Sequence, residues 1–245
     1  MKALIFAAGL GTRLKPITDS VPKALVEVGG RPLLRIVTDK LRRSGITDIC
    51  VNVHHHSDVM KKYLESHDTG LEISDESDML RDTGGGIRHA ATLIKGSGPF
   101  LVHNVDILTD ADISALVSAH RPEALATLLV SDRVTSRYLL FDNDMRLRGW
   151  KNVKTGEIRS PFSDFDPSDC RMLAFGGIHV ISEEVFDIME DWPESFSIID
   201  FYLNVADKHP VFGVEPQSLQ FLDVGKIETL QTANILCERG ERFWE

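Results

Sequence analysis

The segment AAGLGTR at residues 7–13 contains residue types that bind phosphate in proteins. Gly9 and Gly11 let the backbone come close to a ligand and adopt positive φ. Successive backbone N–H groups in such a turn form an anion-binding nest, and Thr12 adds a hydroxyl group. The guanidinium of Arg13 offers a fork of donors that matches phosphate oxygens. These residues predict a phosphate-binding loop.

Two familiar phosphate loops do not account for this segment. The dinucleotide-binding fingerprint requires a third glycine at the position that Leu14 occupies. The P-loop requires Gly-Lys and then Ser or Thr after four intervening residues, and no stretch of the sequence has this spacing. The residues alone leave two interpretations open: a phosphate loop of another kind, or a structural turn.

A second glycine segment, DTGGGI at residues 82–87, stands where a helix is expected to begin. Three glycines at this point are costly to order, which suggests backbone brought against a flat ligand. The alternative interpretation is an N-cap at Thr83 followed by close packing of the helix on the sheet. The two interpretations are compatible with each other.

Asp106 directly follows the apolar segment LVHNV at residues 101–105. A carboxylate at the carboxyl end of a parallel strand points into the crevice where ligands bind. Mg²⁺ is held by few carboxylates together with substrate phosphates, so Asp106 is a candidate ligand. A lone aspartate after a strand is more often a capping residue than a metal ligand. Asp223, which precedes the last predicted helix, is likewise either a metal ligand or a residue of the turn that starts that helix. His54–His56 are not expected to bind a metal, because adjacent residues on a strand point to opposite faces.

These residues need elements that bring them together, and apolar runs alternate with amphipathic stretches along the chain. The alternation predicts right-handed βαβ units, with helices on both faces of a mostly parallel mixed sheet. Around residues 142–144, the turn signal DND predicts a hairpin. We predict strands at Lys2–Ala7, Asp48–Val53, Leu71–Ser74, Phe100–Val105, Ala124–Val130, Tyr138–Phe141, Arg146–Gly149, Leu173–Ile181 and Val211–Val214, and helices at Leu33–Leu41, Val59–Leu64, Gly86–Ile94, Ile113–Val117, Glu183–Met189, Ile198–Ala206 and Ile227–Cys237.

The composition narrows the class of partner. The 245 residues carry 27 Lys and Arg against 37 Asp and Glu, a net charge of −10. This charge argues against nucleic acid and against an anionic membrane surface, while a few local cations can still hold a small phosphate compound. No apolar run approaches the ~20 residues that span a bilayer. Three widely spaced cysteines without metal-binding spacing fit a reduced, cytoplasmic protein.

The stretches GLGTRLKPIT at 9–18 and PKALVEVGGRPL at 22–33 closely resemble the N-terminal signature of the sugar-1-phosphate nucleotidyltransferases, also called nucleotide-sugar pyrophosphorylases. The resemblance implies that the loop wraps a nucleoside triphosphate, with Arg13 neutralising it and Lys23 holding phosphates near the reacting centre. It also implies the Rossmann-like nucleotide-diphospho-sugar transferase fold. We expect one domain over 1–245, with a nucleotide-binding half over about 1–130, a sugar-binding lobe over about 131–225 and a closing helix at 226–238.

Further residues match the family one by one, and some depart from it. The resemblance implies nucleotide contacts from the loop and the glycine turn, sugar-1-phosphate contacts from the middle of the chain, and Mg²⁺ at two aspartates. Val105 replaces a usual glycine, and only the lysine of the family's Glu-Lys-Pro is present at 151. Phe175 replaces the usual Asn or Thr, so the polar contact to the sugar must come from elsewhere or be missing. The residues are Ala8, Gly9, Gly11, Thr12, Arg13, Thr83, Gly84 and Gly85 for the nucleotide, Asn104, Lys151 and Gly177 for the sugar-1-phosphate, and Asp106 and Asp223 for Mg²⁺.

The reaction that the resemblance implies is transfer of a nucleoside monophosphate from an NTP to a sugar-1-phosphate. The acceptor phosphate has a second pKa of about 6, so as a dianion it is its own nucleophile. The TGGGI form most resembles that of N-acetylmuramate-1-phosphate uridylyltransferases, so UTP with N-acetylmuramate-1-phosphate is the first expectation, although the motif does not itself specify the base. Alternatives are mannose-1-phosphate guanylyl transfer, choline-phosphate cytidylyl transfer and a non-catalytic nucleotide-sugar sensor; Leu14 disfavours an NAD-linked oxidoreductase. We expect a monomer or weak homodimer.

Overall fold

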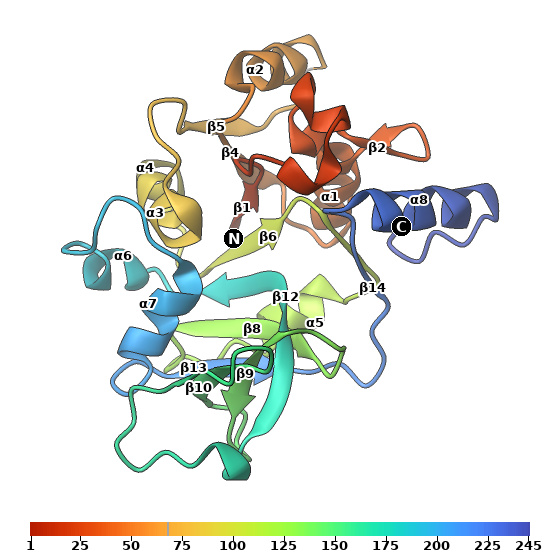
Figure 1. Ribbon diagram of the computed structural model, residues 1–245. Helices are drawn as coiled ribbons and strands as arrows, with labels where there is room; N and C mark the ends of the chain where they lie inside the picture. Colours follow the sequence, from red (N-terminus) through yellow and green to blue (C-terminus); the bar gives the residue numbers. More distant parts are fainter. Residues whose placement is uncertain (68) are drawn as a thin grey trace.

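The computed structural model describes residues 1–67 and 69–245. One ten-stranded sheet dominates the fold, and two short two-stranded sheets flank it (Figure 1). The strands of the large sheet are β1 (Lys2–Phe6), β4 (Asp48–Val53), β5 (Glu72–Asp75), β6 (Phe100–Asn104), β8 (Ala126–Ser131), β9 (Arg137–Phe141), β10 (Leu147–Asn152), β11 (Ile158–Arg159), β12 (Arg171–Ile181) and β13 (Val211–Val214).

The short strands are β2 (Glu27–Val28), β3 (Arg31–Pro32), β7 (Ile107–Thr109) and β14 (Phe221–Asp223). The α-helices are α1 (Leu33–Arg43), α2 (Ser57–Ser66), α3 (Asp82–His89), α4 (Ala91–Ile94), α5 (Ile113–Ser118), α6 (Val185–Ile188), α7 (Ile198–Val205) and α8 (Ile227–Glu238). Four 3₁₀ turns cover Thr12–Leu14, Ile17–Asp19, Lys23–Leu25 and Pro167–Asp169. Within residues 1–67 and 69–245, no helix combines the length and apolar character that crossing a bilayer requires.

The sheet is mixed, as predicted, and its order is β11-β10-β9-β12-β6-β1-β4-β5, with β8 and β13 branching from β12. β1 pairs in parallel with β4 and β6, while β12 is antiparallel to β6, β8 and β9. β12 and β10 therefore run opposite to the other strands of this sheet. The carboxyl ends of β1, β4 and β6 meet at one edge, where ligands bind in open α/β sheets.

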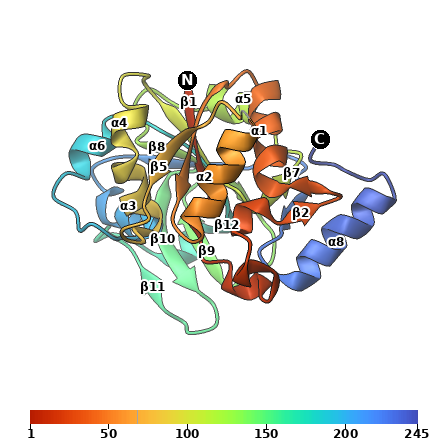
Figure 2. The same ribbon diagram turned by 90° about the horizontal axis from the view of Figure 1, so that it is seen from above.

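Helices cover both faces of the sheet (Figure 2). Alternate residues of β1 enter different cores because successive side chains of a strand point to opposite faces: Ala3 and Ile5 pack with α1, α2, α5 and α8, and Leu4 packs with α3, α4, α6 and α7. All three residues are fully buried. The predicted fold class, a Rossmann-like α/β fold, is confirmed.

The glycine segment at 82–87 is helical, which corrects the predicted turn. α3 begins at Asp82, with Arg81 rather than Thr83 at the N-cap position. The backbone N–H groups of Gly84 and Gly85 donate to the carbonyl oxygen of Phe196, at 2.8 and 3.3 Å. A Cβ at Gly84 would lie 2.2 Å from Cε2 of Phe196. The close approach that these glycines permit is therefore to the 194–196 segment rather than to a flat ligand.

A buried asparagine holds the start of the glycine loop. Oδ1 of Asn52 accepts hydrogen bonds from the backbone N–H groups of Ala7 and Ala8, at 2.7 and 3.2 Å. Its Nδ2 donates to Oε1 of Glu76 at 2.8 Å. Glu76 is fully buried, and its Oε2 has no partner among the described residues. Burial raises the pKa of the Glu76 carboxyl.

The packing of α3 against Phe196 gives a testable expectation. Gly84→Ala should lower the free energy of unfolding by about 1–3 kcal/mol, because the new methyl group overlaps the Phe196 ring. Urea unfolding measures the change. Gly9→Ala is the control, since a Cβ at Gly9 meets nothing within 4 Å. Equal midpoints for the two variants would contradict the close packing.

The buried Glu76 carboxyl gives a second expectation. Its folded-state pKa is raised, so its protonated form suits the fold and ionisation costs stability as the pH rises through that pKa. Glu76→Gln should therefore unfold at a higher temperature than wild type at pH 8, and the difference should shrink toward pH 5. Thermal unfolding across this range tests it, with the exposed Glu72→Gln as control. A difference that grows toward low pH would refute the assignment.

Candidate active site

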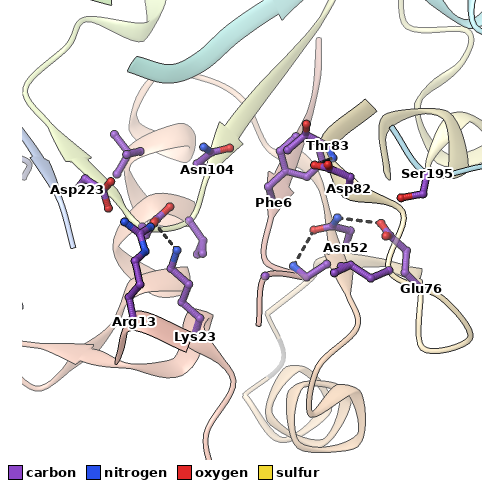
Figure 3. A pocket seen from close by; sticks show the side chains of 16 residues that line it. Phe6, Arg13, Lys23, Asn52, Glu76, Asp82, Thr83, Asn104, Ser195 and Asp223 are labelled. Carbon is purple, nitrogen blue, oxygen red and sulfur yellow. Dashed lines mark hydrogen bonds and ion pairs between the residues drawn. The ribbon is translucent and has the colours of Figure 1, made fainter. Parts of the chain in front are cut away.

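A cleft of about 600 Å³ opens at the edge of the sheet where β1, β4 and β6 end. Arg13, Lys23 and Asp223 lie on one side of it, and Thr83 and Glu76 lie on the other (Figure 3). The wall consists of Phe6, Ala8, Gly9, Arg13, Lys23, Asn52, Glu76, Leu80, Asp82, Thr83, Asn104, Val105, Asp106, Ile107, Ser195 and Asp223. Loop, strand and helix residues from both halves of the chain therefore share one cavity.

The predicted phosphate loop reaches this cleft in part. Ala8, Gly9 and Arg13 line it, whereas Gly11 and Thr12 do not. Gly11 has φ +64°, and its carbonyl oxygen accepts hydrogen bonds from the N–H of Leu14 and the hydroxyl of Thr18, both at 2.8 Å. Gly11 thus shapes the turn that carries Arg13, and the exposed Thr12 begins the 3₁₀ turn after it. The structure does not place these two residues in the wall, contrary to expectation.

Asp223 reaches Asp106 through the pairing of two short strands that the sequence analysis did not predict. β14 runs antiparallel to β7, with Asp223 opposite Ile107. The backbone N–H of Val224 then donates to the carbonyl oxygen of Asp106 at 2.9 Å. Two aspartates far apart in sequence are thereby fixed side by side.

Cations surround the two aspartates. Lys23 forms an ion pair with Asp106, and the two side chains are only 14% and 11% exposed. A Cβ at Gly225 would lie 2.8 Å from Oδ1 of Asp223, 2.9 Å from Oδ2 of Asp106 and 3.0 Å from Nη2 of Arg13. These three charged groups therefore converge on the space that Gly225 leaves free.

This donor set fits a divalent cation such as Mg²⁺. Mg²⁺ binds through one or two carboxylates and takes its remaining ligands from phosphates and water. Asp106 and Asp223 supply two such carboxylates, and the space at Gly225 lies between them. In the described part of the chain, no group of three or more His, Cys, Asp or Glu side chains is placed to hold a metal by itself.

A second cavity, of about 690 Å³, shares Phe6, Asp82, Thr83 and Asn104 with the first. Its remaining wall comes from the second half of the chain and combines aromatic rings with polar groups: Arg137, Tyr138, Leu139, Trp150, Asn152, Glu157, Arg159, Phe175, His179, Ser197, Ile198, Ile199 and Asp200. A molecule held there lies next to a molecule held in the first cleft. The pair of cavities suits a reaction between two substrates.

Lys151 does not line either cavity, and its contact with the acceptor phosphate stays a prediction. Trp150 and Asn152 do line the second cavity, and alternation along β10 directs the residue between them to the opposite face. Arg137 and Arg159 are the cations in that wall instead. The Arg159 guanidinium pairs with Asp200 at 2.8 Å.

Asn104 and Gly177 lie together at the junction of the cavities. Asn104 belongs to both walls. Gly177 has φ +71° in an irregularity of β12, and a Cβ there would lie 2.8 Å from Nδ2 of Asn104. Gly177 therefore gives room to the Asn104 amide, and it is not itself part of the cavity wall.

Sequence reasoning missed Asn52, Glu76 and His179. Each is a polar residue in or just after an apolar strand, which is the signal that could have identified them. The ring nitrogens of two of the adjacent histidines contact backbone carbonyl oxygens: Nδ1 of His54 is 2.7 Å from that of Glu76, and Nε2 of His56 is 3.3 Å from that of Thr18.

Comparisons with known proteins identify the family. The model of the nucleotidyl transferase family matches residues 2–140. An N-acetylmuramate alpha-1-phosphate uridylyltransferase of Caulobacter vibrioides is 33% identical over 227 residues, which cover 89% of each chain. A mannose-1-phosphate guanyltransferase of Saccharomyces cerevisiae is 27% identical over 96% of this chain and 64% of its own length.

Solved structures show the same fold. HddC from Yersinia pseudotuberculosis superposes with a TM-score of 0.74 at 22% identity, over 98% of this chain and 99% of its own. A UDP-glucose pyrophosphorylase complexed with UDP-glucose gives a TM-score of 0.76 at 16% identity, over 98% of both chains. These findings confirm the resemblance described from the sequence. The chain is a nucleotidyltransferase and belongs to the sugar-1-phosphate nucleotidyltransferases of the nucleotidyl transferase family.

Proposed function

We propose that the protein transfers UMP from UTP to N-acetylmuramate-1-phosphate, releases pyrophosphate and uses Mg²⁺. The observation that carries the choice of substrate is the 33% identity, over 89% of both chains, with the Caulobacter vibrioides enzyme named for this reaction. Mannose-1-phosphate with GTP is the second candidate, favoured by the yeast relative. The cytoplasmic location and the monomeric or weakly homodimeric state of the enzyme stay predictions.

The first cleft is the proposed NTP site. Gly9 and Arg13 lie in its wall, where the Gly9 backbone N–H and the guanidinium would face phosphate oxygens. Ala8 also lines the cleft, but its N–H already donates to Asn52. Asp106 and Asp223 are the proposed Mg²⁺ ligands, and the ion would neutralise charge on the phosphates. Thr83, on the opposite wall of the cleft, stays a candidate for contact with the base of the NTP. Gly84 and Gly85 do not, because their N–H groups already bond to Phe196.

Lys23 has two roles in this proposal. Paired with Asp106, its ammonium group compensates a buried carboxylate before substrates bind. With Mg²⁺ held by Asp106, the Lys23 ammonium group would be free to neutralise phosphate charge. The lysine would hold its place near the reacting phosphate by exchanging one anionic partner for another.

The second cavity is the proposed site of the acceptor sugar. The acceptor phosphate oxygen attacks the α-phosphorus, a new oxygen–phosphorus bond forms, and the bond to the β-phosphate oxygen breaks with departure of pyrophosphate. No general base is needed, since the acceptor phosphate is largely dianionic at neutral pH. The protein contributes positioning and charge neutralisation, as in other phosphoryl transfers. The division into a nucleotide half and a sugar lobe is a proposal consistent with these two cavities.

The test of the reaction is pyrophosphate release with Mg²⁺ across four NTPs and a panel of acceptors. We expect turnover with UTP and N-acetylmuramate-1-phosphate, and much less with GTP and mannose-1-phosphate. Choline phosphate is included as an acceptor without a sugar. Turnover confined to GTP with mannose-1-phosphate would replace the substrate proposal by its alternative. Silence across the panel with NTP still bound would favour a sensor.

Removal of either proposed metal ligand should slow the reaction. Asp106→Asn and Asp223→Asn each remove one carboxylate, and we expect kcat to fall by about 10²–10³, as for loss of one preorganised charge interaction. The Mg²⁺ concentration for half-maximal rate should rise in parallel. Asp58→Asn, on the exposed first turn of α2, is the matched control. An Asp106→Asn enzyme with near-wild-type kcat would rule out the metal assignment.

A further inference from the structure

His179 is part of the wall of the second cavity, and its hydrogen-bond partner determines which ring nitrogen carries the proton. The residue is 1% exposed, and its Nδ1 is 2.8 Å from the hydroxyl oxygen of the fully buried Tyr202. Burial lowers the pKa of His179 to about 3 and raises that of Tyr202 well above its usual value. Both side chains are therefore uncharged at neutral pH.

The hydrogen bond between them has one favourable direction. Tyr202 has a single hydroxyl proton, and His179 is its partner among residues 1–67 and 69–245. A buried donor left without an acceptor is costly, so the Tyr202 hydroxyl donates and Nδ1 of His179 accepts. A neutral imidazole that accepts at Nδ1 carries its proton on Nε2. Tyr202 thereby sets the tautomer of His179.

The remaining ring nitrogen is directed to the cavity. Nε2 of His179 makes no hydrogen bond within the described chain. It is also not completely enclosed by protein atoms. His179 is part of the cavity wall. The tip of the ring thus presents an N–H group to whatever fills the cavity, while the rest of the ring is enclosed.

We infer that His179 donates from Nε2 to an oxygen atom of the acceptor sugar, with Tyr202 as the positioning residue. The inference rests on the proposed assignment of the second cavity to the acceptor. The ligand chemistry is an uncharged carbonyl or hydroxyl oxygen, since the donor itself is neutral.

This donor supplies what the neighbouring strand position lacks. Phe175 stands where the resemblance implies Asn or Thr, so β12 offers an aromatic ring there instead of a polar group. The Phe175 and His179 rings lie 5.3 Å apart, edge to face, on the same strand. The Arg159 guanidinium, also in the wall, is already engaged by Asp200 and lies 4.2 Å from the Trp150 ring. His179 thus has an N–H group that is free to donate to a sugar bound in this cavity.

The experiment compares two substitutions that separate the nitrogen positions. His179→Asn keeps an oxygen near Nδ1 for the Tyr202 hydroxyl and loses the donor at the cavity; His179→Gln reaches the Nε2 position with an N–H group. We expect the KM for the acceptor to rise about tenfold in His179→Asn, the fold-change for loss of one hydrogen bond, and less in His179→Gln. The KM for the NTP should not change.

Three controls keep the test decisive. Tyr202→Phe removes the group that sets the tautomer and should raise the acceptor KM by a smaller factor. His67→Asn, at an exposed site on the C-cap of α2, should change neither KM. Nitrogen-15 NMR of the ring, assigned by comparison with His179→Asn, should place the proton on Nε2 without any substrate.

The results that would overturn the His179 inference differ from those that would overturn the proposed substrate. The kinetics use whichever sugar-1-phosphate the wild type turns over, so a different sugar overturns the proposed substrate and leaves the His179 test intact. An unchanged acceptor KM in a folded His179→Asn enzyme, or a parallel rise of both KM values, overturns the inference. A proton on Nδ1 in the wild-type protein also overturns it, and His179→Gln provides the NMR assignment if His179→Asn fails to fold.

Discussion

The juxtaposition of Asp106 and Asp223 is the constraint on which the rest of the site depends. Two carboxylates held side by side repel each other, and neighbouring cations offset that repulsion. The fold supplies Lys23 and Arg13 for this purpose, and it leaves the space at Gly225 free. The two carboxylates suit a divalent cation, and the cationic side chains beside them suit the phosphates of a triphosphate.

The other side of the cleft is built by close packing rather than by charge. Gly84 and Gly85 let α3 approach the 194–196 segment so closely that the Phe196 carbonyl oxygen accepts from both backbone N–H groups. This contact joins the first half of the chain to the segment that leads into α7. Because α7 carries Tyr202 under the second cavity, the packing of one helix connects the two cavities.

Buried polar groups work as positioning devices in both cavities. Asn52 holds the backbone of the glycine loop, and Tyr202 holds the His179 ring. Each pair is enclosed, so its hydrogen bonds face no competition from water and keep one geometry. The cavities thus obtain their rigid polar groups from strands of the sheet, while the loops contribute Arg13 and Lys23.

Much of the fold and part of the site could be predicted from the sequence. Hydrophobic periodicity and the order of strands and helices are local properties, and they led to the α/β class and most elements. The motif around Arg13 and Lys23, and the aspartates at strand ends, identified the family and four charged residues that the structure brings to one cleft. Lys151 and Gly177 lie outside the two cavity walls, and the glycine segment is helical rather than a turn, features that depend on which way each residue faces.

The orientation of each side chain and its distance from other site residues are set by contacts between segments far apart in sequence. The pairing of β14 with β7 joins Asp223 to Asp106, strands of three residues being too short for any periodic pattern. The second cavity exists only once β9, β10, β12 and α7 are assembled, so neither the orientation of Lys151 nor the partner of His179 can be seen in the chain alone. The sequence by itself determined the family, the fold class and the charged groups available. Tertiary structure decided which of them meet, because long-range packing, and not local propensity, sets the direction of each side chain.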